Sequence, residues 1–364
     1  YGNFREESLL TTPDPLTLHR ALAFMHREGA DTVVMEVTSH ALAQHRVEGL
    51  QFRLGLFTHL LPLEHADYHT TFEEYRRVKI RFLDHLTADG VLVYNGATEH
   101  LRAAVVGFGG PKVGYGLPAP GHLAAEAVRF RPSGTTFQVV PHGPVPQLHG
   151  GVRSIAPFSV HMPLLGPSHV SNALAAVAAA LVWGLSADEI REGLASVPPI
   201  RRRMELIRCG EITVVDDTVG HPASLDALFS TVEVLGFRRL VAVVAVRGNR
   251  GVVINEANAA CLAGWCRRCP VAFLVVTSAH DVTAPKDRAE PAEEEAFLDR
   301  LEGAGVPFAF TPYLAEACQR AAAAVRPGDL VLLIGAQAMD RGAELLLQAL
   351  QRHLPAALAR SEAS

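Results

Sequence analysis

The sequence predicts an α/β protein with two domains, each built on a mainly parallel sheet. Its 364 residues are typical of two domains, and 49% of them are hydrophobic, which is enough for two cores. Beyond residue 200, short apolar runs alternate with helical patterns, as in a parallel sheet flanked by helices. A proline-containing stretch at residues 197–200 separates the halves. We therefore expect one domain at residues 1–199 and a second at residues 200–364.

The first half begins with helices and strands in alternation. Asp14 and Pro15 are typical of a helix start and Gly29 of a helix end, so we expect a helix over residues 15–28. Periodicity then predicts two strands, an amphipathic helix, a third strand, a region of short alternating strands and two closing helices. In chain order these are residues 31–37, 52–58, 72–86, 90–94, 122–162, 168–183 and 187–194. The region of short strands predicts a small antiparallel portion.

The second half is more regular, and we expect it to form a Rossmann-like sheet. Its expected strands are residues 211–215, 240–246, 272–276 and 330–334. Its expected helices are residues 222–234, 255–266, 292–301, 314–324 and 340–350. In open α/β sheets of this kind, ligands bind at the carboxyl ends of the strands.

Composition excludes several classes of protein. The net charge of −5 comes without a basic block, so we expect no nucleic-acid partner. No run of about 18 uncharged apolar residues occurs, and the first residues do not resemble a signal peptide, so we expect no membrane partner. The odd number of cysteines, five, predicts reduced thiols in the cytoplasm. Cys266 and Cys269 form a single C-x-x-C motif, and no second pair completes a zinc site.

Polar residues follow the expected strand at residues 31–37. Glu36, Thr38 and Ser39 would lie where a parallel strand meets its loop. The carboxylate of Glu36 could hold a hard cation, directly or through water. A salt bridge at the strand end is the alternative interpretation.

A histidine-rich segment and a lysine come next. His59, His65 and His69 lie within eleven residues, which suits either a metal site or a solvated loop. Lys79 lies among apolar residues of an expected helix, and it could also be a lysine whose ammonium extends past them to solvent. The chain has only three lysines against 30 arginines. A lysine in such a chain favours chemistry that needs a neutral amine, because guanidinium does not deprotonate in proteins.

Taken together, these motifs resemble the Mur ligase family. The matching segments are residues 11–14, 36–42, 44–47, 67–69, 171–176 and 203–205, with Tyr75 and Lys79. The resemblance covers nearly the whole chain, strongly to about residue 205, and is greatest to the branch that adds the third amino acid to a UDP-N-acetylmuramoyl-dipeptide. It implies an ATP-dependent amide ligase of peptidoglycan precursor synthesis. In such enzymes the substrate carboxylate becomes an acyl phosphate, and an amine then displaces phosphate.

The resemblance also implies roles for individual residues. The catalytic, metal-binding residues would be Glu36, His65 and Lys79, which would hold Mg²⁺ with the lysine carbamylated. The UDP-muramoyl substrate would be contacted by Thr11, Thr12, Thr38, Gln44 and Arg46. ATP would be contacted by Asn172, Arg203 and Asp217. The implied partners are a UDP-muramoyl-peptide and an amino acid, and we expect a monomer.

The phosphate-binding loop of the family is missing from the sequence. A Walker A loop needs a lysine followed by Ser or Thr. The three lysines instead precede Ile, Val and Asp: Lys79, Lys112 and Lys286. The Gly-rich turn at residues 248–251 has an arginine and no hydroxyl. In the family this loop precedes the Thr-Thr-Pro segment, so we expect an amino-terminal truncation and weak ATP binding by this chain alone.

The last domain departs further from the family. Gly220 stands where the family has a histidine, and His221 is displaced by one position. Residues 279–282 replace the Asp-Asn-Pro-Arg of diaminopimelate-adding enzymes, and residues 335–339 replace their Gly-Lys-Gly-His-Glu. No arginine is left to hold a distal carboxylate, so diaminopimelate is not the expected amine.

Two alternatives to this ligase stay open. The first is a non-catalytic homologue that binds a nucleotide-sugar or a partner protein. The second is a ligase of polyglutamate or folate-polyglutamate synthesis, which the muramoyl-type residues 44–46 disfavour.

Overall fold

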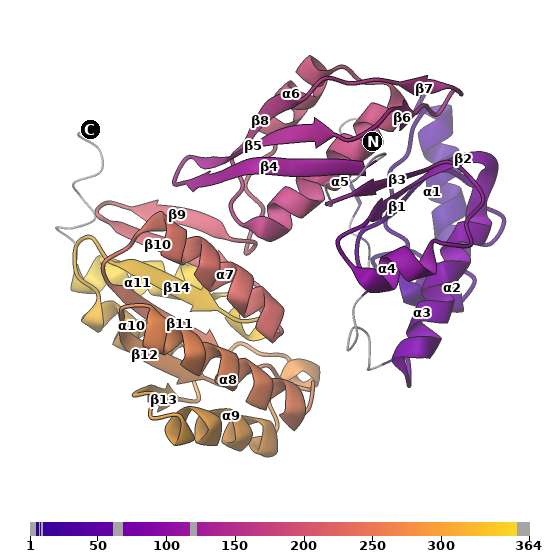
Figure 1. The fold of residues 1–364 in the computed structure, drawn as a ribbon. Helices are drawn as coiled ribbons and strands as arrows, with labels where there is room; N and C mark the ends of the chain where they lie inside the picture. The colour runs from indigo at the N-terminus through magenta and orange to yellow at the C-terminus, as the bar shows by residue number, and fades with distance from the viewer. Residues whose placement is uncertain (1–4, 7, 9, 61–67, 117–121, 355–364) are drawn as a thin grey trace. The chain divides into compact units, whose positions relative to one another are not determined.

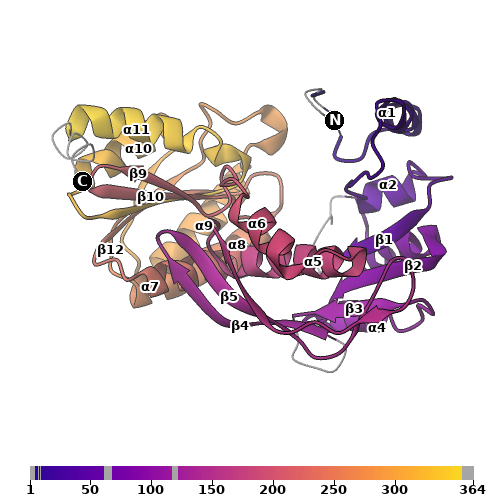
Figure 2. The same ribbon diagram turned by 90° about the horizontal axis from the view of Figure 1, so that it is seen from above.

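The structure is a computed structural model that describes residues 5, 6, 8, 10–60, 68–116 and 122–354 (Figures 1 and 2). The chain divides into two compact units. The first comprises residues 1–126, 138–159 and 171–191, and the second comprises residues 127–137, 160–170 and 192–364. Each unit is described by itself. The predicted domain boundary at residues 199 and 200 stays a prediction.

The main feature of the first unit is a six-stranded sheet in the order β1-β2-β3-β4-β5-β8, in which residues 127–131, 134–137 and 160–162 of the last three strands belong to the second unit. Its strands are β1 (Phe52–Phe57), β2 (Leu86–Asn95), β3 (Lys112–Tyr115), β4 (His122–Arg131), β5 (Gly134–Pro141) and β8 (Phe158–Met162). Strands β1 to β4 pair in parallel. A separate antiparallel pair is formed by β6 (Val145–Pro146) and β7 (Val152–Arg153). The predicted combination of a parallel sheet with a small antiparallel portion is therefore confirmed.

Helices cover this sheet and precede it. They are α1 (Pro15–Arg27), α2 (Ser39–Ala43), α3 (Phe72–Ile80), α4 (Glu99–Ala104), α5 (Pro167–Trp183) and α6 (Ala187–Ala195). Asp14 caps α1 by accepting the amide of Thr17, as predicted. The expected helix over residues 72–86 is shorter than predicted. After Ile80 the chain tightens into the 3₁₀ turn Arg81–His85 and enters β2 directly.

The predicted strand over residues 31–37 is wrong. These residues have no regular secondary structure, and Val34 is 93% exposed. A strand is held by hydrogen bonds to a neighbour. Within the described part of the chain, the amides of residues 31–35 form no backbone hydrogen bond to another segment. The apolar run is therefore present without the partner strand that would bury it.

The second unit contains another six-stranded sheet, in the order β13-β12-β11-β14-β10-β9. Its strands are β9 (Glu205–Cys209), β10 (Ile212–Asp217), β11 (Leu240–Ala245), β12 (Val271–Thr277), β13 (Ala309–Thr311) and β14 (Leu330–Ile334). All neighbours pair in parallel except β9 and β10, which are antiparallel. Sequence patterns had not indicated β9 or β13, which are edge strands.

Five helices cover the second sheet. They are α7 (Pro222–Leu235), α8 (Val252–Arg268), α9 (Pro291–Gly303), α10 (Leu314–Ala324) and α11 (Gly342–His353). Figure 2 shows α10 and α11 on one face of the sheet and α7, α8 and α9 on the other. Because alternate residues of β11 face opposite sides of the sheet, this layering gives two apolar cores. Val241 and Val243 pack with α10 and α11. Ala242 and Val244 pack with α7 and α8. The Rossmann-like prediction is confirmed.

No helix among the described residues is long and apolar enough to cross a membrane.

Candidate functional site

A cavity of about 940 Å³ lies in the first unit, beside the open side of β1. It is lined by residues 31–39, by β1 and by one side of α5. Its polar lining lies at both ends of the first two segments: Glu36, Thr38, Ser39 and Thr58 where they end, and Asp31, Thr32, Gln51 and Arg53 where they begin. Lys79 of α3 also lines it. The cavity therefore brings together two of the predicted metal-binding residues, Glu36 and Lys79.

Thr12 fixes the backbone on the polar side of this cavity. Its side chain is fully buried, and its hydroxyl donates a hydrogen bond to the carbonyl oxygen of Glu36 (3.0 Å). The same hydroxyl accepts the backbone amide of Thr38 (3.2 Å). Both neighbours of Val37 are thereby held, while the Glu36 side chain stays exposed. Thr12 thus fixes the backbone from which the exposed carboxylate of Glu36 extends.

Arg46 joins this arrangement from the segment after α2. Its Nη1 donates to the carbonyl oxygen of Thr12 (2.7 Å), and its Nε and Nη2 donate to Oε1 of Gln44 (3.0 and 2.5 Å). Gln44 in turn donates to the hydroxyl of Tyr68 (3.4 Å). Four of the five predicted substrate-binding residues, Thr12, Thr38, Gln44 and Arg46, therefore form one hydrogen-bonded network. The fifth, Thr11, is exposed next to Thr12.

Ser39 provides a polar group for a ligand. It is the first residue of α2, whose start is capped when the Thr38 hydroxyl accepts the amide of Ala41 (3.1 Å). Ser39 is fully buried, and its Oγ has no hydrogen-bond partner among the described residues. Buried hydroxyls are nearly always paired. Because Ser39 lines the cavity, a bound molecule could supply the missing partner.

Lys79 lines the cavity with its Nζ near two aromatic rings. Its Nζ lies 5.6 Å from the centre of the Phe57 ring and 5.8 Å from that of Tyr75. Ring faces attract a cation at such distances. Lys79 therefore lines the same cavity as Glu36, with its Nζ over two aromatic rings.

The third predicted metal-binding residue, His65, lies outside the described residues. Within the described ranges, no three His, Cys, Asp or Glu side chains gather to hold a metal ion. The donors that do line the cavity, the Glu36 carboxylate and the Ser39 hydroxyl, are oxygens, which Mg²⁺ prefers. The residues present therefore fit a magnesium ion with an incomplete ligand set.

His69 is one of the three histidines for which the sequence left open a metal site or a solvated loop. It is buried, and its ring lies 4.9 Å from that of Tyr68 and 5.4 Å from that of Tyr75, between ring centres. Tyr68 also contacts the ring of His40 at 4.2 Å. This aromatic cluster connects α2 with α3, and so connects the Thr38 end of the site with Lys79.

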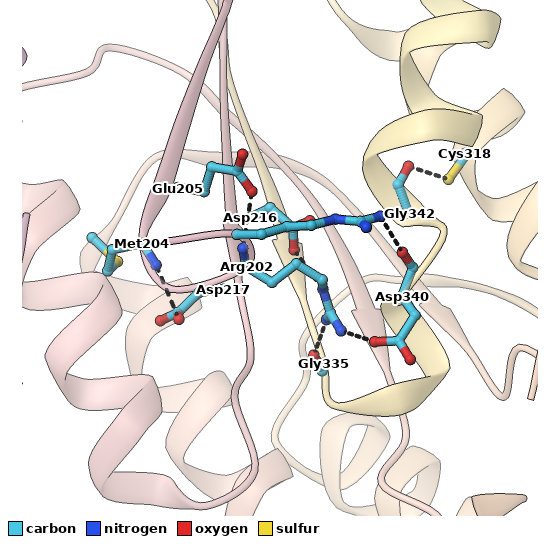
Figure 3. Close-up of polar contacts among 10 residues, drawn as sticks. Arg202, Met204, Glu205, Asp216, Asp217, Cys318, Gly335, Asp340 and Gly342 are labelled. Atoms are coloured by element: carbon cyan, nitrogen blue, oxygen red, sulfur yellow. Dashed lines mark hydrogen bonds and ion pairs between the residues drawn. The ribbon is translucent and has the colours of Figure 1, made fainter. Parts of the chain in front are cut away.

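The second unit has its polar centre at the carboxyl ends of β10 and β14 (Figure 3). The Arg202 side chain is buried there, pairing with Asp216 and Asp340 and donating to the carbonyl oxygen of Gly335. Burial raises the pKa of Asp216 to about 6, although Arg202 opposes the shift. Arg202 therefore makes the buried contacts, and Arg203, the predicted ATP contact, is its exposed neighbour.

Arg203 and Asp217 have different surroundings in this unit. The Arg203 side chain is exposed and lines a cavity of about 370 Å³. Asp217 accepts the amide of Met204 (3.2 Å), and burial raises its pKa. Asn172, the third predicted ATP contact, is exposed on α5 of the first unit. The three predicted ATP contacts thus lie in different units, with Asn172 and Arg203 open to solvent.

Arg247 lies in the space that a side chain at position 220 would need. A Cβ built on Gly220 would be 1.5 Å from Nη1 of Arg247. His221 does not replace the family's histidine through Nδ1, because that atom caps α7 by accepting the amide of Ser224 (3.3 Å). The guanidinium of Arg247 therefore occupies the space beside Gly220.

The backbone amides of the Gly-rich turn at residues 248–251 bind a carboxylate of the same chain, that of Glu293. The amides of Asn249, Arg250 and Gly251 donate to the carboxylate of Glu293 (3.0, 2.8 and 2.5 Å). Burial opposes ionisation, but the backbone amides together lower the pKa of Glu293. This turn is filled by Glu293, which agrees with the prediction that it is not a phosphate loop.

Two other sequence features have structural roles. Asp281, in the segment that replaces Asp-Asn-Pro-Arg, caps α10 by accepting the amides of Leu314 and Ala315 (2.7 and 3.0 Å). Cys266 and Cys269 lie at the end of α8, and burial raises the pKa of Cys266 to about 11. Both cysteines are free thiols, as predicted.

Comparison with known proteins gives the class of the molecule. The Mur ligase middle domain matches residues 1–180, and the Mur ligase, glutamate ligase domain matches residues 202–337. These two matches cover the middle and the C-terminal domain of Mur ligases. The chain belongs to the Mur ligase family.

The chain is similar to UDP-N-acetylmuramoyl-L-alanyl-D-glutamate–2,6-diaminopimelate ligases. That of Geobacillus thermodenitrificans is 33% identical over 254 residues, covering 66% of this chain and 48% of the relative. That of Syntrophomonas wolfei is 29% identical over 341 residues, covering 92% of this chain and 65% of the relative. The chain thus spans about half to two thirds of the length of these relatives.

Solved structures agree on the fold. A diaminopimelate ligase structure has a TM-score of 0.60 at 21% identity, covering 94% of this chain and 69% of that one. MurF ligase from Thermotoga maritima in complex with ADP has a TM-score of 0.66 at 13% identity, covering 87% of this chain and 66% of that one.

Proposed function

We propose that this chain is part of an ATP-dependent ligase that adds an amino acid to a UDP-N-acetylmuramoyl-peptide. The observation that carries the proposal is the Thr12 network, which holds Glu36, Thr38 and Arg46 beside a cavity that Lys79 also lines. The network contains four of the five residues that the family resemblance implies for the muramoyl substrate. The relatives that match the chain are ligases of this kind by name.

The reaction would have two balanced steps. A carboxylate oxygen of the muramoyl-peptide attacks the terminal phosphorus of ATP, and ADP leaves. The amine of the incoming amino acid then attacks the acyl carbon, inorganic phosphate leaves, and a proton is lost from the new amide. Both steps concentrate negative charge at phosphate oxygens, so cationic groups are the natural catalysts.

Arg46 is the group that we assign to the anionic substrate. Three of its five N–H groups are taken by Thr12 and Gln44, which leaves two for a ligand. Gln44 and Thr12 also fix the plane of the guanidinium, so little rotational freedom is lost when an anion binds. Thr38 and Thr11 are the further substrate contacts in this proposal.

Glu36, His65 and a carbamylated Lys79 are the proposed ligands of magnesium. Such an ion, when bound, neutralises charge on the transferring phosphoryl group. In carbamylation the neutral amine of Lys79 would add to carbon dioxide and lose a proton, which would replace a cation with an oxygen ligand. The rings of Phe57 and Tyr75 favour the charged ammonium instead. A bound Mg²⁺ would favour the carbamate as one of its oxygen ligands.

The ATP contacts that we propose are Asn172, Arg203 and Asp217. Asn172 and Arg203 have exposed side chains that a nucleotide could reach. We further propose a monomeric, cytoplasmic enzyme without a nucleic-acid or membrane partner. Its amine is not diaminopimelate, because Asp281 caps α10 and the segment carries no arginine for a distal carboxylate.

A non-catalytic homologue is the second candidate. The observation that favours it is the absence of a Walker A lysine from the sequence of 364 residues. Such a protein would bind the UDP-muramoyl ligand at Arg46 without turning over ATP.

Amide formation by the complete gene product separates these candidates. The enzyme would be incubated with ATP, Mg²⁺, UDP-N-acetylmuramoyl-L-alanyl-D-glutamate and each of the common amino acids, and products weighed by mass spectrometry. The ligase proposal expects one new conjugate, formed only with ATP. Binding without any conjugate would favour the non-catalytic homologue, and neither binding nor product would reject both.

A further inference from the structure

The second unit contains a pocket of about 370 Å³ that the proposed reaction uses only through Arg203. Three segments line it: the β4–β5 turn at residues 132 and 133, residues 163–165 before α5, and residues between 199 and 208 that lead into β9. Its volume lies toward the small end of the range for ligand pockets, which is about 300–1,000 Å³. We name it the arginine pocket, because Arg203 and Arg208 both line it.

Close packing fixes one side of the arginine pocket. Gly134 has a φ of 125°, and a Cβ built on it would lie only 2.2 Å from the carbonyl oxygen of Met162, so glycine is required there. The next residue, Thr135, is fully buried, and its hydroxyl donates to the carbonyl oxygen of Leu164 (2.6 Å). The β4–β5 turn and residues 163–165 therefore keep fixed positions relative to each other.

The backbone on both sides of Arg203 is also fixed, and it is strained. Arg202 and Met204 have positive φ values of 56° and 51°, a conformation that is costly for residues other than glycine and that gathers at ligand sites. The amide of Met204 donates to Asp217 (Figure 3), and Nε2 of His169 donates to the carbonyl oxygen of Arg203 (3.0 Å). The Arg203 side chain therefore extends into the pocket from a well-held turn.

The two guanidiniums carry unused hydrogen-bonding capacity. Both side chains are exposed, and within the described part of the chain neither has a hydrogen bond or an ion pair. The carboxylate of Asp217 attracts Arg203 from outside the pocket lining. Glu205 also lines the pocket, and its carboxylate accepts the amide of Arg202 (2.9 Å). Two guanidiniums and one carboxylate leave the lining with a net positive charge of one.

That charge suits a singly charged anion. A carboxylate carries one negative charge, whereas a phosphate monoester carries about 1.5–2 at pH 7. Guanidinium groups bind such oxyanions through pairs of parallel hydrogen bonds. The pocket is therefore complementary to one carboxylate-type group.

The rest of the pocket is apolar. Prolines from all three segments line it, and a proline has no backbone N–H to offer a ligand. Leucines at positions 164, 165 and 206 add further apolar surface. A ligand that fits both parts has a compact apolar body and one oxyanion.

We propose that the arginine pocket binds an organic monoanion, with a single carboxylate-type group held by Arg203 and Arg208 and a compact apolar body held by the prolines and leucines. Binding of this ligand goes beyond the proposed function, because it requires neither ATP nor a muramoyl substrate.

A regulatory consequence follows, and it rests on the proposed function. Arg203 is also a proposed ATP contact. An anion already bound at its guanidinium repels the phosphates of ATP, since like charges at close range raise the free energy of binding. The occupant of the arginine pocket therefore inhibits nucleotide binding.

A pair of fluorescent probes tests the pocket. 8-Anilinonaphthalene-1-sulfonate has an apolar body and one oxyanion, and N-phenyl-1-naphthylamine has the same rings without the charge. We expect the sulfonate to bind residues 1–364 at one site, at least about tenfold more tightly than the neutral amine. The difference should shrink as salt is added, because both arginines are exposed. Equal binding of the two probes, or no saturable binding of the sulfonate, would overturn the proposal.

Matched variants locate the bound probe. Arg208→Gln should weaken binding of the sulfonate at least about fivefold and leave binding of the neutral amine unchanged, which also shows that the pocket is still folded. Arg238→Gln changes an exposed arginine of the same unit that does not line the pocket, and should alter neither probe. Sulfonate binding that survives Arg208→Gln, or that Arg238→Gln weakens equally, would reject the arginine pocket.

The regulatory consequence is tested on the complete gene product. Saturating sulfonate should lower its affinity for ATP at least about fivefold, and should do so less in Arg208→Gln at the same probe concentration. Unchanged ATP affinity with the sulfonate bound would overturn the inhibition. A gene product that binds the sulfonate as expected but never binds ATP would reject the proposed ligase function, and the monoanion pocket would stand.

Discussion

Nη1 of Arg46 donates a hydrogen bond of 2.7 Å to the carbonyl oxygen of Thr12, across 34 positions of the sequence. This contact joins the segment before α1 to the segment after α2. Because Thr12 also holds Glu36 and Thr38, one arginine, one carboxylate and one threonine take fixed relative positions. Residues that are far apart in sequence therefore act as one site.

Thr12→Val tests the centre of that site. Valine has nearly the same shape but cannot donate to the Glu36 carbonyl or accept the Thr38 amide, which leaves these two partly buried backbone groups without that partner. We expect a loss of about 1–3 kcal/mol in the stability of the first unit. Hydrogen exchange of α2 and β1 amides measures it. Thr11→Val, at the exposed neighbouring position, is the control and should change exchange little; equal effects of both variants would show that the network contributes nothing.

Lys79→Arg tests the chemistry of the only lysine on the cavity. Arginine keeps the positive charge and the contact with the two rings, but it cannot form a carbamate. If the carbamate holds magnesium, amide formation by the complete gene product should fall at least about 100-fold. Lys112→Arg is the matched control, because the Lys112 ammonium only donates to the carbonyl oxygens of Val105 and Phe108. A carbamate signal from ¹³C-bicarbonate that is absent from the Lys79 variant would support the assignment, and full activity of Lys79→Arg would reject it.

Glu293→Gln tests the contact between the Glu293 carboxylate and the backbone amides of the Gly-rich turn at residues 248–251. The folded-state pKa of Glu293 lies below its ordinary value, so its contribution to stability is present above about pH 4.5 and is lost as the pH falls through the folded pKa. The variant should therefore be less stable by about 1.5–3 kcal/mol at pH 7, and the difference should shrink in acid. Urea unfolding followed by Trp265 fluorescence, in a Trp183→Phe background, measures it. Glu295→Gln, an exposed position on the same helix, should show neither effect; a pH-independent difference would contradict this role for the carboxylate.

Gly220→His tests whether Arg247 occupies the space of the family's histidine. The new side chain must displace the Arg247 guanidinium, which lies 1.5 Å from the Cβ position. Gly220→His should therefore be more destabilising with Arg247 present than in an Arg247→Ala background. The expected coupling free energy is about 0.5–3 kcal/mol, from a double-mutant cycle in urea. Additive effects of the two changes would mean that they do not share the space.

The fold was largely predictable because most elements carry their own signal. Asp14 and Pro15 mark the start of α1, and the buried runs of β11 and β14 read as strands of a parallel sheet. The strand predicted for residues 31–37 is wrong for the opposite reason. Their apolar run is typical of a strand, but pairing decides whether a strand forms, and no partner is present in the described chain.

The site was predictable only in part. Family resemblance singled out Thr12, Thr38, Gln44 and Arg46, and the structure joins them, although no local pattern shows that a buried threonine hydroxyl links two distant segments. The contrast between the buried Arg202 and the exposed Arg203 was not predictable, because adjacent arginines look alike in sequence. Arg202 has a positive φ (56°), and its side chain pairs with Asp216.

The most direct test of the account is a calorimetric titration of UDP-N-acetylmuramoyl-L-alanyl-D-glutamate into residues 1–364. Arg46 and its network are complete in this chain, so binding should be measurable without ATP. We expect saturable binding that weakens at least about tenfold in Arg46→Ala and is unchanged in Arg27→Ala, an exposed arginine of α1. No binding at millimolar ligand, or equal binding by both variants, would contradict the claim that the Thr12 and Arg46 network is a muramoyl-substrate site.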